Sequence, residues 1–121
     1  MPLLSLTVSD LPDLTNAKLF TFNGQIDESN LEEVKTKVDP LADDTVTQFL
    51  VFNFKDLEYI NSKGVGYLAA LYLHISKMTP PKKIFIVESG EEVMDILSLV
   101  GLNSIIEHFP TTEEALARIK G

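Results

Sequence analysis

Apolar and polar side chains alternate in two segments near the start of the chain. Residues 4–8 read Leu-Ser-Leu-Thr-Val, which is the period of a strand with one buried face. Residues 18–23 alternate again, and Gly24 ends the pattern. Between them, residues 10–16 carry a proline and several polar side chains, which is typical of a turn. The pattern predicts two N-terminal strands.

A helical period follows. Leu31, Val34 and Val38 are spaced to form one apolar stripe. Asp27 or Ser29 can cap the helix, and Ser29-x-x-Glu32 has the form of a capping box. Asp39-Pro40 is predicted to end the helix, since the residue before a proline disfavours helical geometry.

The longest ordered pattern lies in the middle of the chain. Residues 49–54 are an apolar run rich in aromatic residues, which predicts a buried strand. Residues 61–64 form a polar turn around Ser62, and residues 65–77 have helical spacing. This helix is apolar nearly all round, because Tyr67, Leu71 and Met78 lie off its main stripe. Either it is covered on both sides within the domain, or its outer side is a binding surface.

The remaining segments alternate between strand and helix. We predict a strand at residues 83–87, a helix at 91–100, a strand at 105–109 and a last helix that begins with a Thr111-x-x-Glu114 capping box. Gly101 has the position of a left-handed C-cap. The order β-β-α-β-α-β-α-β-α predicts one α/β domain over residues 1–121, with a mixed, mostly parallel sheet.

Composition narrows the function. The 121 residues include no cysteine, which excludes disulfides, thiol catalysis and thiolate metal sites. The formal net charge of −8 argues against nucleic acid or an anionic membrane as a partner. Neither a leader nor an apolar run of about 20 residues is recognised. We therefore expect a soluble, cytoplasmic protein without membrane insertion.

Ser62 is the residue on which the function depends, and it can be a cap, a nucleophile or a switch. The hydrolase elbow G-x-S-x-G lacks its first glycine here, and His74 lies 12 residues along the same helix, about 18 Å away. His108 is predicted to lie on a distant strand. Asp27 and Glu28 are interpreted as helix N-terminal charges, so we expect no metal, no cofactor and no catalytic residue. A phosphate on Ser62 would suit a helix N-terminus.

Three stretches resemble one known family, the STAS domain of sulfate transporters and anti-sigma factor antagonists. The central stretch is LVFNFKDLEYINSKGVGYL at residues 50–68. The segment GQIDESN at residues 24–30 is similar to the family's sequence before its first helix. Residues 93–102 and 113–116 match its C-terminal pattern. The resemblance covers about residues 3–116.

The resemblance implies a sheet of about five strands with about four helices largely on one face. It also implies phosphorylation of Ser62 by an anti-sigma factor kinase, and regulation of transcription by partner switching. Asn53 and Asn61 stand where the family has aspartates, and Lys63 replaces a small residue. The predicted partner-binding residues are Asn61, Ser62, Lys63, Gly64, Tyr67 and Leu71.

Three classes of function compete as explanations of this sequence. The leading hypothesis is a non-enzymatic, stand-alone STAS protein that binds an anti-sigma factor or serine kinase-like partner. The alternative is a small-ligand sensor that holds an anion, nucleotide or lipid near Asn53, Asn61 and Ser62. An enzyme is disfavoured by the sparse acid–base inventory. A homodimer is compatible with the sequence.

Overall fold

The computed structural model describes residues 3–121. Strands and helices follow one another in the predicted order, with one short 3₁₀ helix, η1, added before the last strand. The elements are β1 (Leu4–Leu11), β2 (Leu14–Ile26), α1 (Leu31–Asp43), β3 (Phe49–Ile60), α2 (Ser62–Ser76), β4 (Lys83–Val87), α3 (Glu91–Leu99), η1 (Leu102–Ser104), β5 (Glu107–Phe109) and α4 (Thr112–Lys120).

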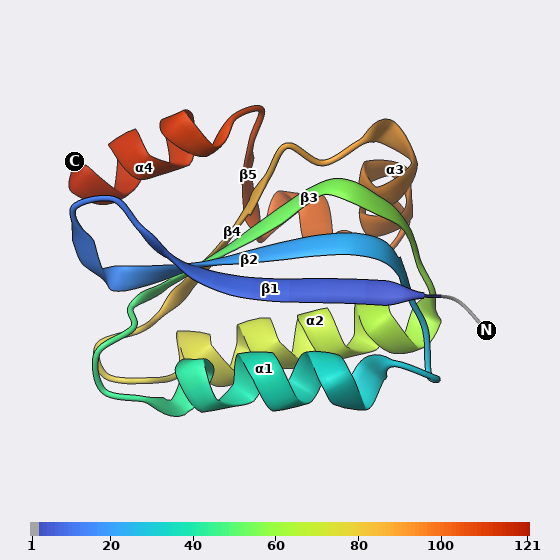
Figure 1. Ribbon diagram of the computed structural model, residues 1–121, viewed down its shortest axis with the longest axis horizontal. Coiled ribbons are helices and arrows are strands. Elements are labelled where there is room, and N and C mark those ends of the chain that lie inside the picture. Colours follow the sequence, from blue (N-terminus) through green and yellow to red (C-terminus); the bar gives the residue numbers. More distant parts are fainter. Residues whose placement is uncertain (1–2) are drawn as a thin grey trace.

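The five strands form one sheet in the order β1-β2-β3-β4-β5 (Figure 1). β1 and β2 are antiparallel. The pairs β2–β3, β3–β4 and β4–β5 are parallel. The mixed, mostly parallel sheet is therefore confirmed, and β1 and β5 are its two edges.

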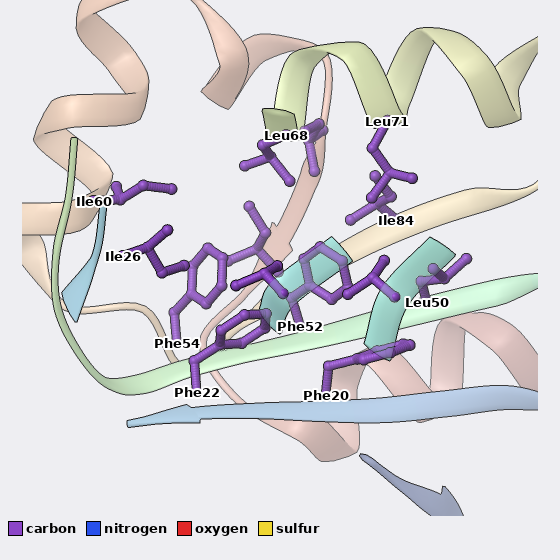
Figure 2. Close-up of a cluster of buried hydrophobic side chains, with 14 of the residues drawn as sticks. Phe20, Phe22, Ile26, Leu50, Phe52, Phe54, Ile60, Leu68, Leu71 and Ile84 are labelled. Carbon is purple, nitrogen blue, oxygen red and sulfur yellow. The ribbon is translucent and has the colours of Figure 1, made fainter. Parts of the chain in front are cut away.

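Helices α1 and α2 cover one face of the sheet, below it in Figure 1. Four phenylalanines from β2 and β3 line this face and meet edge to face, with ring centroids 5.2 Å apart for Phe20 and Phe52. Leu68 and Leu71 of α2 point toward these rings (Figure 2). Helix α3 adds Val93 and Leu97 to the same core.

Helix α4 packs on the opposite face. Its Ala115 is buried with Val51 of β3 and with Phe85 and Val87 of β4 in a second, smaller core. These strand residues alternate with those of the first core, so the central strands β3 and β4 are buried on both sides. This explains why their sequences are almost continuously apolar.

The start of α1 differs from the prediction. The N-cap is Asn30, and neither Asp27 nor Ser29 caps the helix, so the Ser29-x-x-Glu32 capping box is wrong. The side chain of Asn30 makes no cap hydrogen bond either, because it is hydrogen-bonded to the preceding loop instead. Its Oδ1 accepts from the backbone N–H of Asp27 (3.1 Å), and its Nδ2 donates to the carbonyl of Gln25 (2.8 Å).

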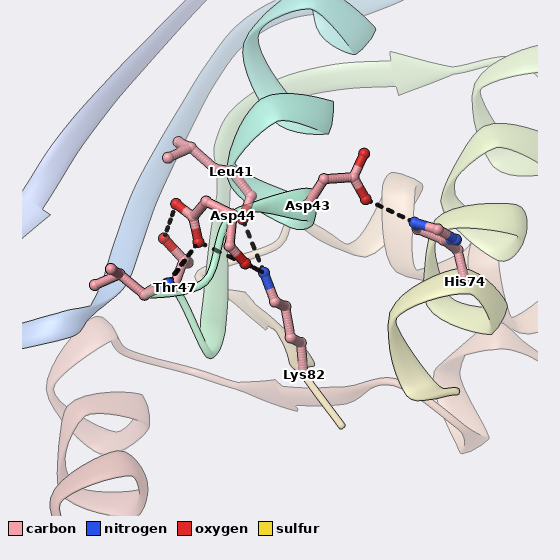
Figure 3. A network of polar contacts seen from close by, with 7 residues as sticks. Leu41, Asp43, Asp44, Thr47, His74 and Lys82 are labelled. Atoms are coloured by element: carbon pink, nitrogen blue, oxygen red, sulfur yellow. Dashed lines mark hydrogen bonds and ion pairs between the residues drawn. The ribbon is translucent and has the colours of Figure 1, made fainter. Parts of the chain in front are cut away.

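The predicted end of α1 at Asp39-Pro40 is also wrong, since the helix continues through Pro40 to Asp43. The last turn buries Ala42 in the core. It is also held by Lys82, whose Nζ donates to the carbonyls of Leu41 (3.3 Å) and Asp44 (2.6 Å; Figure 3). Tertiary packing and a cation at the helix end offset the missing N–H of the proline.

Two predicted caps are confirmed. Gly101 follows the end of α3 with a φ of 80°, in the left-handed region. Thr111 caps α4, because its Oγ1 accepts from the N–H of Glu114 (3.2 Å). Among residues 3–121, no helix is both long and apolar enough to cross a bilayer.

Candidate functional site

Ser62 lies at a tight junction between β3 and α2. β3 ends at Ile60, and the next residue, Asn61, donates its backbone N–H to the carbonyl of Ile26 at the end of β2 (3.0 Å). The Oδ1 of Asn61 then accepts from the N–H of Gly64 (3.1 Å). Asn61 is therefore the N-cap of α2, and Ser62, for which a cap was one of the three roles considered, is the first residue of the helix. The side chains of Ser62 and Lys63 are exposed.

Gly64 allows the first turn of α2 to lie against the sheet. A Cβ atom at this position would come within 2.6 Å of Cγ1 of Ile60 and 2.9 Å of Cγ2 of Ile26. Any larger residue would push the helix start outward and move Ser62 with it. The glycine is thus a packing requirement of the junction, and its own atoms are buried.

An acidic loop borders the serine. Glu28 accepts a hydrogen bond at Oε2 from Nδ2 of Asn61 (2.6 Å). In the same loop, Oδ1 of Asp27 accepts from Oγ (2.5 Å) and N (2.8 Å) of Ser29. The hydroxyl of Ser29 is the main reason why the pKa of Asp27 lies below its usual range. The loop that connects β2 to α1 therefore brings the Glu28 carboxylate to the start of α2.

Sequence reasoning missed the contact between Glu28 and Asn61. The two residues are 33 positions apart, and a residue that follows a strand gives no sign of which neighbouring loop it will touch. Parallel pairing of β2 with β3 brings the loops together, because Ile26 and Ile60 are partners at the same end of the sheet.

Helix α2 is covered on two sides and open on a third. Leu68, Leu71 and Ile75 face the sheet and are buried. The exposed positions run along the helix from the serine: Ser62, Lys63, Gly66, Ala70, Leu73, His74 and Lys77. Both alternatives for its apolar surface thus hold in part. An outer surface exists, but it is narrower than the sequence indicated.

Two residues of the predicted partner surface face inward. Leu71 is only 4% exposed and contacts the sheet core, and Gly64 is buried under the turn. Their inclusion among the partner-contacting side chains is corrected, because neither can be reached from outside. The residues of α2 that are exposed in this part of the helix are instead Gly66, Ala70 and Leu73.

Tyr67 is half-buried between α2 and α1. Its hydroxyl donates to Oδ1 of Asp39 (2.5 Å), and Nζ of Lys35 lies 6.0 Å from the ring centroid. Burial and the Asp39 carboxylate raise the pKa of the Tyr67 hydroxyl, so it is a neutral donor at physiological pH. Tyr67 thus links the two helices and is only partly accessible to a partner.

Asn53 lies apart from Ser62. It pairs with Val87 of β4, its Nδ2 donates to Oε2 of Glu88 (3.4 Å), and its Oδ1 accepts from the N–H of Lys55 (2.9 Å). The β2 partners of Asn53 and Ile60 are five residues apart, Thr21 and Ile26. At about 3.3 Å per residue this is about 17 Å of strand. The structure therefore does not bring Asn53 into one ligand site with Asn61 and Ser62.

The histidines are also remote from the serine. His74 lies near the far end of α2, where its Nε2 is 2.8 Å from Oδ1 of Asp43 (Figure 3). His108 is in the edge strand β5. Within residues 3–121, no group of three or more acidic or histidine side chains could hold a metal ion.

Comparison with known proteins identifies the family. The family model for the STAS domain matches residues 9–115, and the chain belongs to this family. Its fold is similar to that of an anti-sigma factor antagonist from Mycobacterium paratuberculosis, with a TM-score of 0.82, 21% identity, and coverage of 98% of this chain and 95% of the other. No curated protein sequence matches the chain.

Two structures of SpoIIAA extend the likeness. The unphosphorylated form of this anti-sigma factor antagonist gives a TM-score of 0.77 at 18% identity, with 97% of each chain covered. The phosphorylated form of the Bacillus protein gives 0.73 at 16% identity, with 95% of this chain and 99% of the other covered. The TM-scores show that the fold is shared.

Proposed function

We propose that this chain is a non-enzymatic regulatory protein that binds an anti-sigma factor or serine kinase-like partner. The binding surface consists of the Ser62 loop and the exposed side of α2, namely Ser62, Lys63, Gly66, Ala70 and Leu73. We call it the α2 surface. Phosphorylation of Ser62 switches the binding off. The observation that carries the proposal is the exposure of Ser62 on a rigid, capped helix start at the end of an open helix face.

The junction is built to accept a charge at Ser62 without refolding. Its cap is made by Asn61, so the serine hydroxyl is not needed for the turn. A phosphate adds a charge of about −1.5 to −2 and is favoured by the free N–H groups of a helix N-terminus. Glu28, which is bonded to Asn61, opposes part of this gain. Phosphorylation thus changes the surface while the fold stays the same.

The composition of α2 indicates the charge and polarity of the partner surface that would fit it. Residues 62–76 include no Asp or Glu, although the whole chain has a net charge of −8. Lys63 lies at one end of the exposed side, and Leu73, which is 54% exposed, lies near the other. Such a surface suits an apolar partner patch with acidic groups at its rim. A phosphate on Ser62 would repel those acidic groups.

Calorimetry with the candidate kinase-like partner tests the proposal. Ser62→Asp should weaken binding by at least about tenfold, or about 1.4 kcal/mol, and Ser62→Ala should bind nearly as well as the wild type. The matched control is Ser98→Asp, which adds the same charge to an exposed position of α3. The phosphoswitch is refuted if Ser62→Asp binds as tightly as the wild type, or if the control weakens binding equally.

A second variant tests the α2 surface separately from the charge. No atom lies within 4 Å of a Cβ built at Gly66, so Gly66→Gln should fold normally and project a side chain from the centre of the surface. We expect it to weaken partner binding as well. Mass spectrometry after incubation with the partner and ATP should place the phosphate on Ser62, and phosphorylation of a Ser62→Ala variant would assign it elsewhere.

A further inference from the structure

β1 is an edge strand with an unusual composition. Figure 1 shows it at the front of the sheet, with α1 running below it. Residues 3–9 contain no charged side chain and no proline. Edge strands are normally blunted by charges, prolines or bulges, because their free N–H and C=O groups can pair with another chain. Over these residues, β1 itself carries none of these devices.

The register identifies which backbone groups point outward. Gln25 donates its N–H to the carbonyl of Leu3 (3.1 Å), and the next partners are Leu4 with Gly24. In an antiparallel pair, hydrogen-bonded and non-hydrogen-bonded positions alternate. Leu3 is bonded to β2, and so are the odd-numbered positions that follow it. The N–H and C=O groups of Leu4, Leu6 and Val8 therefore face away from the sheet.

One side chain from another element reaches this edge. Nζ of Lys37 in α1 donates to the carbonyl of Leu6 (2.6 Å), which is the centre of the uncharged segment. The same ammonium lies 3.7 Å from Oε2 of Glu33, one turn earlier in α1. Lys37 thus occupies an outward-facing acceptor and places a charge on a segment, residues 3–9, that has none of its own.

We propose that the outer edge of β1 is a pairing surface for a second copy of this chain, and that Lys37 keeps it closed. The sequence is nearly symmetric about Leu6, which favours a copy of itself as the occupant. Antiparallel pairing centred on Leu6 places Leu4 opposite Val8 of the second copy on the core face. It places Ser5 opposite Thr7 on the other face, so apolar meets apolar and polar meets polar.

This surface is separate from the α2 surface, since it uses neither α2 nor the Ser62 loop. With Lys37 in place, a second strand would have to displace its ammonium from the central acceptor. The monomer is then favoured. Loss of the ammonium frees the Leu6 carbonyl and removes the charge, so two edges can join into one continuous sheet.

Sedimentation equilibrium of the full chain tests the proposal. Lys37→Met keeps the aliphatic stem and removes the donor, and we expect it to strengthen self-association at least tenfold, while the wild type and Lys37→Arg stay monomeric. The matched control is Lys35→Met on the same helix. Lys35 pairs with Glu32 (3.8 Å) and lies over Tyr67, so its loss should leave the monomer unchanged.

Amide exchange identifies the interface. In the monomer, the outward-facing amides of Leu6 and Val8 should exchange faster than those of Ser5 and Thr7, and dimerisation of Lys37→Met should protect them. Adding Thr7→Lys to Lys37→Met should restore the monomer, because the two lysines at position 7 would lie diagonally across the strand pair and repel each other. The proposal is overturned if the wild type already pairs through β1, or if Lys37→Met with a native melting curve stays monomeric. A dimer that leaves Leu6 and Val8 unprotected also overturns it.

Discussion

Gly64 packs so closely against Ile60 that a Cβ atom at Gly64 would lie 2.6 Å from Cγ1 of Ile60. Cγ2 of Ile26 lies 2.9 Å from the same Cβ position. Both isoleucines are buried, so neither side chain has room to move aside. Gly64→Ala should therefore destabilise the protein by about 1–3 kcal/mol, the usual cost of overpacking. Urea denaturation measures the change. A variant as stable as the wild type would mean that the α2 start can shift freely.

Gly66 provides the opposite expectation two residues further on. A Cβ there meets no atom within 4 Å, and the residue lies inside α2. Gly66→Ala should stabilise the protein by up to about 1 kcal/mol, because alanine is the better helix former. The same urea denaturation shows whether the free energy of unfolding rises or falls. If both glycine variants lose stability, the position of α2 described above is wrong.

Asn61 combines two bonds in one side chain. Its oxygen caps α2 and its amide nitrogen donates to Glu28. Asn61→Ala should cost about 1 kcal/mol through loss of the cap. Asn61→Asp keeps the cap oxygen but places a second carboxylate beside Glu28. Thermal melts at pH 7 should show it less stable than the wild type; equal stability would show that Glu28 does not matter.

The arrangement of elements could be predicted from the sequence because local patterns determine it. Alternation in residues 4–8, the apolar run of β4 and the glycine at position 101 each specify their own conformation. Asn61 was predictable for the same reason, since a cap bonds to the backbone three residues away. STAS membership also followed from short segments in a fixed order.

The remaining features depend on tertiary contacts. Leu71 and Gly66 could not be assigned to inside and outside, because α2 is apolar on nearly every side and only packing against the sheet and α1 decides its rotation. Lys82 is 5% exposed, yet nothing in the pair Lys82-Lys83 indicates which ammonium will be buried. The continuation of α1 past Pro40 required knowledge of that buried lysine.

Asp44 gives the stability a dependence on pH. Burial acts to raise its pKa, but bonds from Thr47 to Oδ1 (2.7 Å) and Oδ2 (2.9 Å), with help from Val46 and Lys82, hold the pKa below its usual range. Because the folded pKa is below the unfolded one, the ionised carboxylate contributes its full stability above about pH 4. This contribution is lost as the pH falls through the folded pKa.

Denaturation from pH 7 to pH 2 of the wild type and Asp44→Asn measures this contribution. The wild type should be the more stable at pH 7, and the difference should shrink as the pH falls below about 4. Asp95→Asn is the matched control, since Asp95 is exposed on α3 and lies outside the Thr47 turn. A difference that stays constant over the whole range would exclude Asp44 as the source.

Ser62 and Ser76 are the first and last residues of α2, and they offer the same substitution at opposite ends of one helix. A carboxylate at the N-terminus is favoured by the helix dipole and at the C-terminus disfavoured, by about 0.3–1 kcal/mol at exposed sites. Glu28 beside Asn61 opposes the gain at Ser62. We therefore expect Ser62→Asp to change the free energy of unfolding by less than about 0.5 kcal/mol.

Ser76→Asp should lose stability through the dipole. It also loses the bond from Oγ of Ser76 to the carbonyl of Leu73 (3.1 Å). Urea denaturation at low salt compares the two variants, and repeating it at 1 M salt should narrow the gap, because screening shortens the reach of the charges. If Ser62→Asp is the more damaging variant, the helix start cannot accept a negative charge, and a phosphate on Ser62 would act by unfolding the junction. If Ser62→Asp is tolerated, the effect of phosphorylation lies in the surface that a partner meets.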